Sequence, residues 1–231
     1  MRRYFLAIVA LVAASVFAVL FISGITAEKK NGIYYRATGS RSKIALTFDD
    51  GPHPVYTEQI LAILEKEGIK ATFFAIGCNV KQYPQIFKRV VRAGHEIGNH
   101  TYTHPLVPLV TKEILEEEIE RTDALLESLG CARPLFFRPP QGKFPQGKEE
   151  LLEKTGKIAV LWSIDTRDWE HKSVEEIVRM VENEVAGGDI ILFHDFVGGE
   201  SQTIPAIKKL IPTLNERGYQ FVTLSQLLLD E

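Results

Sequence analysis

His100 and His104 are the first residues whose type and spacing could bind a metal ion. If the segment between them turns helically, both imidazoles lie on one side and can reach one cation at the roughly 2.0 to 2.1 Å that zinc requires. Surface or structural histidines also occur at this spacing. A carboxylate as third ligand favours the metal, since two imidazoles and one carboxylate leave a tetrahedral zinc with an open position for water or substrate.

Two acids, Asp49 and Asp50, stand side by side in the stretch TFDDGP, residues 47–52. Adjacent side chains diverge on an extended strand, so neighbouring acids can serve one site only where the strand ends and turns. Gly51 and Pro52 supply that turn. One acid can then bind the cation while the other activates a water molecule. The spacing leaves open which acid has which role, and a plain turn-initiating pair is the alternative.

The elements that must position these residues are short apolar runs that alternate with segments of helical period. The runs are KIALTF, ATFFAI, IAVLWSI, DIILF and QFVTL. They lack strict alternation, so we expect strands covered on both faces, in a parallel sheet with right-handed crossovers. The fold class is therefore α/β. Open sheet and closed barrel are not separated by periodicity, but both gather active residues at the carboxyl ends of strands.

Helices are expected near residues 57–67, 84–93, 147–155 and 204–217. A further amphipathic helix is expected from Thr111 to a stop at Gly130, because apolar positions recur at helical spacing in Leu115, Ile119, Thr122, Leu126 and Leu129. Another helix begins with the capping box SVEE at Ser173 and ends at Gly187 and Gly188.

Ionisable residues stand at the ends of five stretches that we read as strands, KIALTF, HEIGNH, LFF, IAVLWSI and DIILF, and this places them at one mouth of the fold. They are Asp49 and Asp50, His100 and His104, Arg138, Asp165 and Asp168, and His194.

The N-terminus has two arginines followed by an uncharged stretch from Tyr4 to Ala27. A membrane-spanning helix needs roughly 20 apolar residues, whereas a cleaved signal has an apolar region of about 7 to 15. We therefore expect an uncleaved single-pass membrane anchor over residues 1–27, a linker over 28–42 and a catalytic domain over 43–231 outside the cytoplasm. Cleavage after Ala27, giving a secreted protein, and a buried core helix are the alternatives.

Composition limits the class of protein. The chain has 231 residues, 45% of them hydrophobic and 25% charged, which suits one globular domain with a sizeable core. A net charge of -3 and a pI near 6.1 give no basic surface and argue against nucleic acid as a partner. Cys78 and Cys131 lack a CxxC spacing, and we expect unpaired thiols, with a single bridge as the alternative.

Five motifs occur in a fixed order: TFDDGP, HTYTH, RPPQG, DTRDW and LFH. In these motifs the chain resembles polysaccharide deacetylases of the NodB-homology type, carbohydrate esterase family 4, from about Lys43 to Leu228. The resemblance implies a distorted (β/α) barrel with fewer regular strands than a TIM barrel. It also implies a metal-dependent hydrolase that acts on linear amide C–N bonds and removes acetyl groups from amino-sugar polymers.

The resemblance assigns Asp50, His100 and His104 to one divalent metal ion, with zinc expected and cobalt or nickel as alternatives. Such an ion polarises the acetamide carbonyl and lowers the pKa of water at the site. By the same resemblance Asp49 is the general base.

For the other catalytic groups, the resemblance implies that His194 protonates the departing amine. A nearby carboxylate would keep the imidazole charged, and Asp168 resembles that partner, with Asp165 as second candidate. Arg138 would pair with Asp49.

The resemblance gives substrate contacts to Gln141, whose backbone N–H would stabilise the oxyanion, and to Trp169 and Pro140 in the groove. The family commonly has an aromatic residue at the position of Gln141. Any non-proline residue keeps the main-chain contact, so we expect activity and leave the preferred sugar open. Three other histidines are expected to be structural: His53, His95 and His171.

The expected substrate is an extracytoplasmic N-acetylated amino-sugar polymer, peptidoglycan first and chitin oligomers second. The expected partners are this glycan and, through the N-terminal helix, the membrane, and the protein is expected to be a monomer. Two alternatives belong to other classes: a catalytically silent glycan-binding domain at the cell surface, and an amidohydrolase of the same fold that acts on a small cyclic amide.

Overall fold

The structure is a computed structural model that describes residues 26–30, 32–196 and 198–229. Its strands are β1 (Thr26–Lys30), β2 (Ile33–Thr38), β3 (Lys43–Asp49), β4 (Thr72–Ala75), β5 (Glu96–Asn99), β6 (Phe136–Phe137), β7 (Ile158–Val160), β8 (Ile164–Asp165), β9 (Ile190–His194) and β10 (Gln220–Phe221). Its α-helices are α2 (Tyr56–Lys66), α3 (Gly77–Gln82), α4 (Pro84–Arg92), α5 (Lys112–Ser128), α6 (Lys148–Thr155), α7 (Val174–Glu184), α8 (Thr203–Glu216) and α9 (Leu224–Leu228). Short 3-10 helices are η1 (Val107–Leu109), η2 (Pro140–Gly142) and η3 (Asp168–Glu170).

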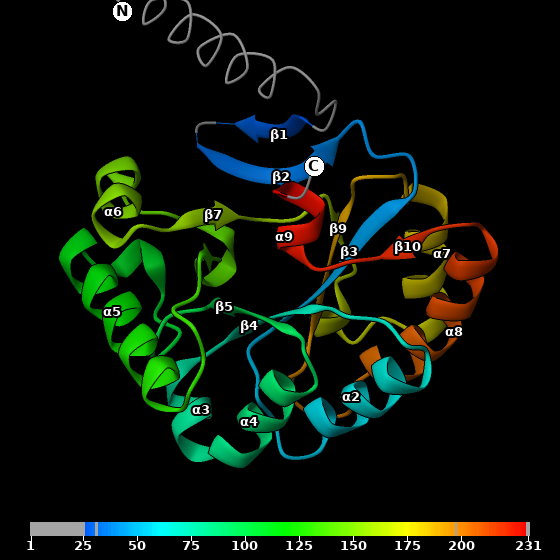
Figure 1. The fold of residues 1–231 in the computed structure, drawn as a ribbon, viewed down its shortest axis with the longest axis horizontal. Coiled ribbons are helices and arrows are strands. Elements are labelled where there is room, and N and C mark those ends of the chain that lie inside the picture. The colour runs from blue at the N-terminus through cyan, green and yellow to red at the C-terminus, as the bar shows by residue number, and fades with distance from the viewer. Residues whose placement is uncertain (1–25, 31, 197, 230–231) are drawn as a thin grey trace, which may run out of the picture.

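The strands form one curved sheet in the order β1-β2-β7-β6-β5-β4-β3-β9-β8, with β10 also paired to β3. The β1–β2 pair is antiparallel, and the other pairs of named strands are parallel. Figure 1 shows helices α2 to α8 around the outside of the strands. No pairing joins β8 to β1 within the described ranges. The fold is therefore an α/β distorted parallel half-barrel, which confirms the predicted α/β class.

The core lies on both faces of the central strands. Every residue of β4 is buried, as is every residue of β3 after Lys43. The Phe48 ring stacks on Phe73 and Phe193, with ring centroids 5.0 and 6.0 Å apart. Burial on both faces removes the need for alternating polar residues, and this explains the continuous apolar runs.

The predicted helices are confirmed. Where an end of α2, α4, α6 or α8 differs from the expected end, it differs by one residue. The Thr111 side chain caps α5, and the predicted capping box at Ser173 opens α7. Helix α7 ends at Glu184, before the predicted glycine stop. Helices α3 and α9 were not expected from the sequence.

One predicted strand is wrong. The run IAVLWSI divides into β7 and β8, which pair with different neighbours in the sheet. Trp162 and Ser163 lie between them, outside both strands. Trp162 lines the cavity described below.

The segment predicted as a linker over 28–42 contains strand residues: 28–30 lie in β1, and a second strand covers Ile33–Thr38. These residues form β2, which pairs in parallel with β7. Ile33 and Ala37 are buried, and the N–H of Ala37 donates to the carbonyl of Gly188 at 2.8 Å. Alternate apolar positions face the core, as expected of a strand, so the folded unit begins before Lys43.

The anchor predicted over residues 1–27 lies outside the described residues, except for Thr26 and Ala27 in β1. In the described part of the chain, no helix combines the length and the apolar character needed to cross a bilayer. Cys78 and Cys131 are free, as predicted.

Candidate metal and active site

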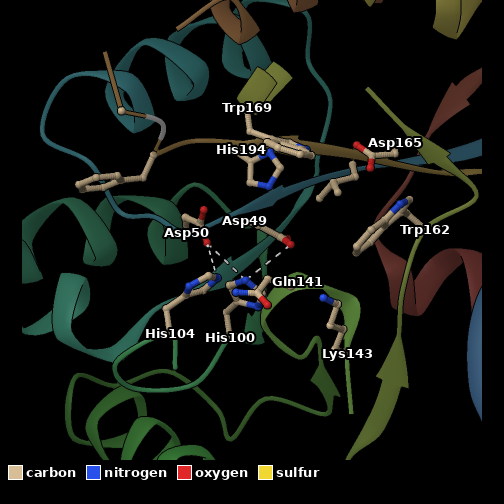
Figure 2. Close-up of a pocket in the computed structure, with 13 residues that line it drawn as sticks. Asp49, Asp50, His100, His104, Gln141, Lys143, Trp162, Asp165, Trp169 and His194 are labelled. Carbon is tan, nitrogen blue, oxygen red and sulfur yellow. Dashed lines mark ion pairs between the residues drawn. The ribbon is translucent and has the colours of Figure 1, made fainter. Parts of the chain in front are cut away.

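A cavity of about 560 Å³ lies at the carboxyl ends of the strands (Figure 2). It brings together most of the candidate residues. Its lining consists of Asp49, Asp50, His100, His104, Gln141, Lys143, Trp162, Asp165, Trp169, Leu192, His194, Phe196 and Gly198.

Asp50, His100 and His104 form a set of possible metal ligands whose donor atoms all lie within 4.8 Å of one another. The Oδ1 atom of Asp50 is 3.3 Å from Nε2 of His100 and 3.4 Å from Nε2 of His104. This oxygen is buried and accepts no hydrogen bond from the described residues. A buried acceptor between two imidazole nitrogens suits a divalent cation, so the three residues fit the metal that the sequence predicts.

Electrostatics at this carboxylate favour its charged form. Burial alone would raise the pKa of Asp50, but the adjacent His100, with His194 and His104 nearby, outweighs burial and lowers it. Asp50 is thus ionised, as a metal ligand must be.

The two histidines meet without a helical turn, which corrects the geometry expected from their spacing. His100 follows β5, and its Nδ1 lies 2.7 Å from the carbonyl oxygen of Arg138, which leaves Nε2 for a metal. The segment then bends, with left-handed φ angles of 69° at Thr101 and 54° at His104. The bend brings the His104 ring to 5.0 Å from the His100 ring.

Glu118 on α5 holds this bend. Its Oε2 atom accepts hydrogen bonds from the backbone N–H groups of Tyr102 at 2.9 Å and Thr103 at 2.6 Å. From the other side, the N–H of Gly77 donates to the Thr101 carbonyl at 2.9 Å. The residues between the two histidines are therefore fixed by partners from two helices.

The turn after β3 fixes Asp50. Asp50 itself has a left-handed φ of 81°, and its carbonyl accepts a 2.7 Å hydrogen bond from Asn79. A Cβ atom at Gly51 would lie 2.1 Å from Oδ2 of Asp195, so only glycine fits there. Asp195 is buried below the turn and accepts from Thr57 at 2.5 Å. Burial and the nearby acids raise its pKa to about 7.

Asp49 pairs with Arg138, as the resemblance implies. The Arg138 guanidinium is fully buried and donates to Oδ1 of Asp49 at 2.7 Å and to Thr47 at 2.9 Å. It also donates to the carbonyls of Val160 and Leu161. The other Asp49 oxygen lies 3.8 Å from Nε2 of His100 and faces the metal site. Adjacent acids therefore serve one site in different ways, one held by arginine and one by histidines.

His194, at the end of β9, lies across the cavity from the two metal-site histidines (Figure 2). Its Nδ1 is 2.7 Å from Oδ1 of Asp168. Burial opposes charge on the imidazole, but the Asp168 hydrogen bond and charge outweigh it and raise the pKa of His194 to about 9. Asp165, the second candidate partner, accepts instead from the N–H of Arg167 at 3.0 Å.

The structure brings two of the three predicted substrate contacts into the cavity. Gln141 and Trp169 line the cavity, and Trp169 is half exposed. Pro140 is buried and is absent from the lining, so the structure does not bring it into the groove. It opens η2, where its carbonyl accepts from the N–H of Lys143 at 3.3 Å.

Several site residues were missed from the sequence. Trp162 interrupts an apolar run, a signal that could have identified it, and Lys143 follows the RPPQG motif directly. Glu118 carries no local signal, because its contact depends on how α5 packs beside the bend. Other residues missed from the lining are Leu192, Phe196 and Gly198. His53 and His95 accept backbone hydrogen bonds outside the metal set.

Comparisons with known proteins agree with this geometry. A sequence profile described as "Polysaccharide deacetylase" matches residues 36–160. The chain is 43% identical over 203 residues to the peptidoglycan-N-acetylglucosamine deacetylase of Bacillus cereus, covering 87% of this chain and 95% of that protein. It is 37% identical over 206 residues to the chitooligosaccharide deacetylase of Bradyrhizobium sp., covering 84% and 94%.

A solved structure is similar over the same region. The crystal structure of the Bc1960 peptidoglycan N-acetylglucosamine deacetylase superposes with a TM-score of 0.82 at 35% identity, covering 87% of this chain and 94% of that one.

Proposed function

Since the chain belongs to the polysaccharide deacetylase family of the NodB-homology type, carbohydrate esterase family 4, we propose that it hydrolyses the N-acetyl groups of peptidoglycan amino sugars outside the cytoplasm. One observation carries the proposal: the Asp50–His100–His104 set shares one cavity with Asp49 and His194, which lie side by side at the ends of β3 and β9. Chitin oligomers are the second candidate substrate, because a chitooligosaccharide deacetylase is among the relatives.

Asp50, His100 and His104 would hold a divalent ion, zinc first and cobalt or nickel next, through one carboxylate oxygen and two imidazole nitrogens. When bound, such an ion supplies Lewis-acid polarisation of the acetamide carbonyl and a lowered pKa for water.

Asp49 would accept a proton from the attacking water while the water oxygen bonds to the acetyl carbon. The Arg138 ion pair orients this carboxylate, and its free oxygen faces the site. The backbone N–H of Gln141 makes no hydrogen bond to a described residue, so it can donate to the carbonyl oxygen as negative charge develops there.

His194 would then donate its proton to the sugar nitrogen as the C–N bond breaks, giving acetate and a free amino group. The hydrogen bond to Asp168 orients the ring and keeps it protonated before this step. Trp169 offers an exposed aromatic face against which a sugar ring can stack.

The test is incubation of the purified, zinc-loaded protein with peptidoglycan fragments and with chitin oligomers, followed by mass spectrometry. We expect loss of acetyl groups from the sugars and stoichiometric acetate, with neither seen for Asp49→Asn. A protein that binds one zinc ion per chain but releases no acetate from either glycan would instead support the silent glycan-binding alternative. Opening of a small cyclic amide without deacetylation would support the amidohydrolase alternative.

We also propose that the N-terminal segment anchors the catalytic domain outside the cytoplasm. The paired arginines and the uncharged stretch that follows support this placement. Protease added to protoplasts, whose wall is removed and whose membrane is intact, should digest the catalytic domain. Its protection, together with recovery in the cytoplasmic fraction, would contradict the proposed location, while recovery in the medium would indicate cleavage near Ala27.

A further inference from the structure

The loop from Gln141 to Lys143 forms one wall of the cavity and has a fixed backbone. Gln141 and Gly142 have left-handed φ angles of 60° and 66°. The N–H of Gly142 donates to the Pro139 carbonyl at 3.0 Å. A Cβ atom at Gly142 would lie 2.9 Å from Cη2 of Trp162, so the loop packs closely on that ring. Lys143 therefore projects from a backbone held in place relative to the cavity.

Lys143 is the only lysine or arginine that lines this cavity among the described residues. Figure 2 shows its side chain directed toward the space between Gln141 and Trp162. The acids in the lining have other partners: Asp49 pairs with Arg138, Asp50 with the two histidines, and Asp165 accepts from a backbone N–H. No ion pair joins the Lys143 ammonium to an acid in the described part of the chain.

A cation in this position affects which sugar polymer binds well. A neutral glycan that covered the cavity would remove water from the Lys143 ammonium without supplying an opposite charge, which is unfavourable. A glycan that carries a carboxylate would supply a charge-assisted hydrogen bond. Chitin oligomers are neutral, whereas peptidoglycan carries carboxylates on the lactyl groups of every second sugar or on the attached peptides.

We propose that Lys143 is a specificity-determining residue that binds a carboxylate of the substrate and favours acidic cell-wall glycan over neutral oligomers. The inference rests on the proposed deacetylation at the neighbouring metal site. Lys143 lines the same cavity as the metal set, two residues after Gln141, so its ammonium can reach a glycan bound there.

The experiment compares kcat/KM of the full-length zinc protein for three substrates: chitin oligomers, peptide-free glycan strands with free lactyl carboxylates, and strands whose carboxylates lie on their peptides. For Lys143→Gln, the ratio of kcat/KM for the preferred acidic glycan over chitin should fall about tenfold, mostly through KM. Lys143→Arg should keep most of this preference and Lys143→Glu should reverse it. The acidic arm that responds to Lys143→Gln identifies the source of the carboxylate.

Lys208→Gln is the matched control, because Lys208 is exposed on α8 away from the cavity and its loss should leave the ratio unchanged. The preference of the unaltered protein should also weaken as salt screens the charge. An unchanged ratio in Lys143→Gln, with the unaltered protein active on these glycans, would overturn the role of Lys143 alone. An unaltered protein that releases no acetate from any of the three would instead contradict the proposed function.

Discussion

Nδ1 of His194 and Oδ1 of Asp168 are 2.7 Å apart, and the second Asp168 oxygen accepts from the His194 backbone N–H at 2.8 Å. Asp168 thus holds both the ring and the backbone of one residue. Thr203 donates to the same second oxygen at 2.5 Å, which fixes the carboxylate in turn. With the pKa of His194 raised to about 9, the imidazole carries its proton through the neutral range.

The first prediction concerns the alkaline limb of the pH profile. A general acid acts while it is protonated, so activity should be lost as pH rises through the pKa of His194. Asp168→Asn removes the charge that raises this pKa, so the alkaline limb of kcat/KM should move to lower pH. His194→Ala should lower kcat by about 10² to 10⁴-fold.

The Asp165→Asn variant tests which of the two carboxylates, Asp165 or Asp168, sets the pKa of His194. No hydrogen bond or ion pair joins Asp165 to His194 within the described residues, and Asp165 accepts from a backbone N–H, so its substitution should leave the alkaline limb in place. Acetate release measured across pH decides the matter. A shift in Asp165→Asn with none in Asp168→Asn would show that Asp165, and not Asp168, raises the pKa of His194.

The second prediction concerns metal and stability. A ligand that binds only the folded chain stabilises it by about 4 kcal/mol at a thousandfold excess over Kd. Zinc should therefore raise the Tm and a chelator should reverse the rise, whereas Asp50→Asn should show little of either. His171→Gln should respond to zinc like the unaltered protein, because His171 is exposed outside the ligand set. Thermal unfolding with and without zinc is the measurement.

The third prediction concerns Glu118, which orients the segment between two metal ligands. Substitutions of groups that orient metal ligands weaken metal binding by about 10 to 100-fold. We expect a loss in this range for Glu118→Ala in competition with a chromophoric chelator. Glu117→Ala, an exposed neighbour on the same helix, is the control. Equal zinc affinity in the two variants would mean that the bend holds without this carboxylate.

The fourth prediction concerns the ion pair between Arg138 and Asp49. Both side chains are almost fully buried, and removal of one partner leaves an uncompensated charge in the interior. Arg138→Met should lower the free energy of unfolding by about 3 to 5 kcal/mol. Arg89→Met, which breaks a pair with Glu58 whose side chains are 59% and 25% exposed, should cost less than about 1 kcal/mol. Urea unfolding of both variants measures the difference. Similar losses of unfolding free energy would show that burial does not set the cost of breaking the Arg138–Asp49 pair.

The site is predictable from sequence where a local motif by itself determines the direction of the backbone and the placement of the side chains. TFDDGP places two acids at a strand end, and the structure turns the chain there through the left-handed backbone of Asp50. The resemblance, rather than the spacing, divided the roles of Asp49 and Asp50. The two histidines meet as expected, but through a bend held by Glu118, whose contribution depends on tertiary packing.

The fold was predictable where strands are buried on both faces, and less so at its margins. Trp162 divides one apolar run into two strands because an aromatic side chain can serve a cavity as well as a core, and hydropathy does not separate these uses. Ile33 and Ala37 face the core from a six-residue strand whose other positions are two tyrosines, an arginine and a threonine, a pattern too weak to distinguish from a loop.

Strand β2 also determines where a shortened form of the protein can safely start. It covers β7, so a recombinant chain that begins at Lys43 would leave the backbone groups of β7 without their partner on that side. An uncovered strand edge invites pairing with other chains. Soluble versions that retain Thr26 onward should stay monodisperse at concentrations where the shorter form aggregates.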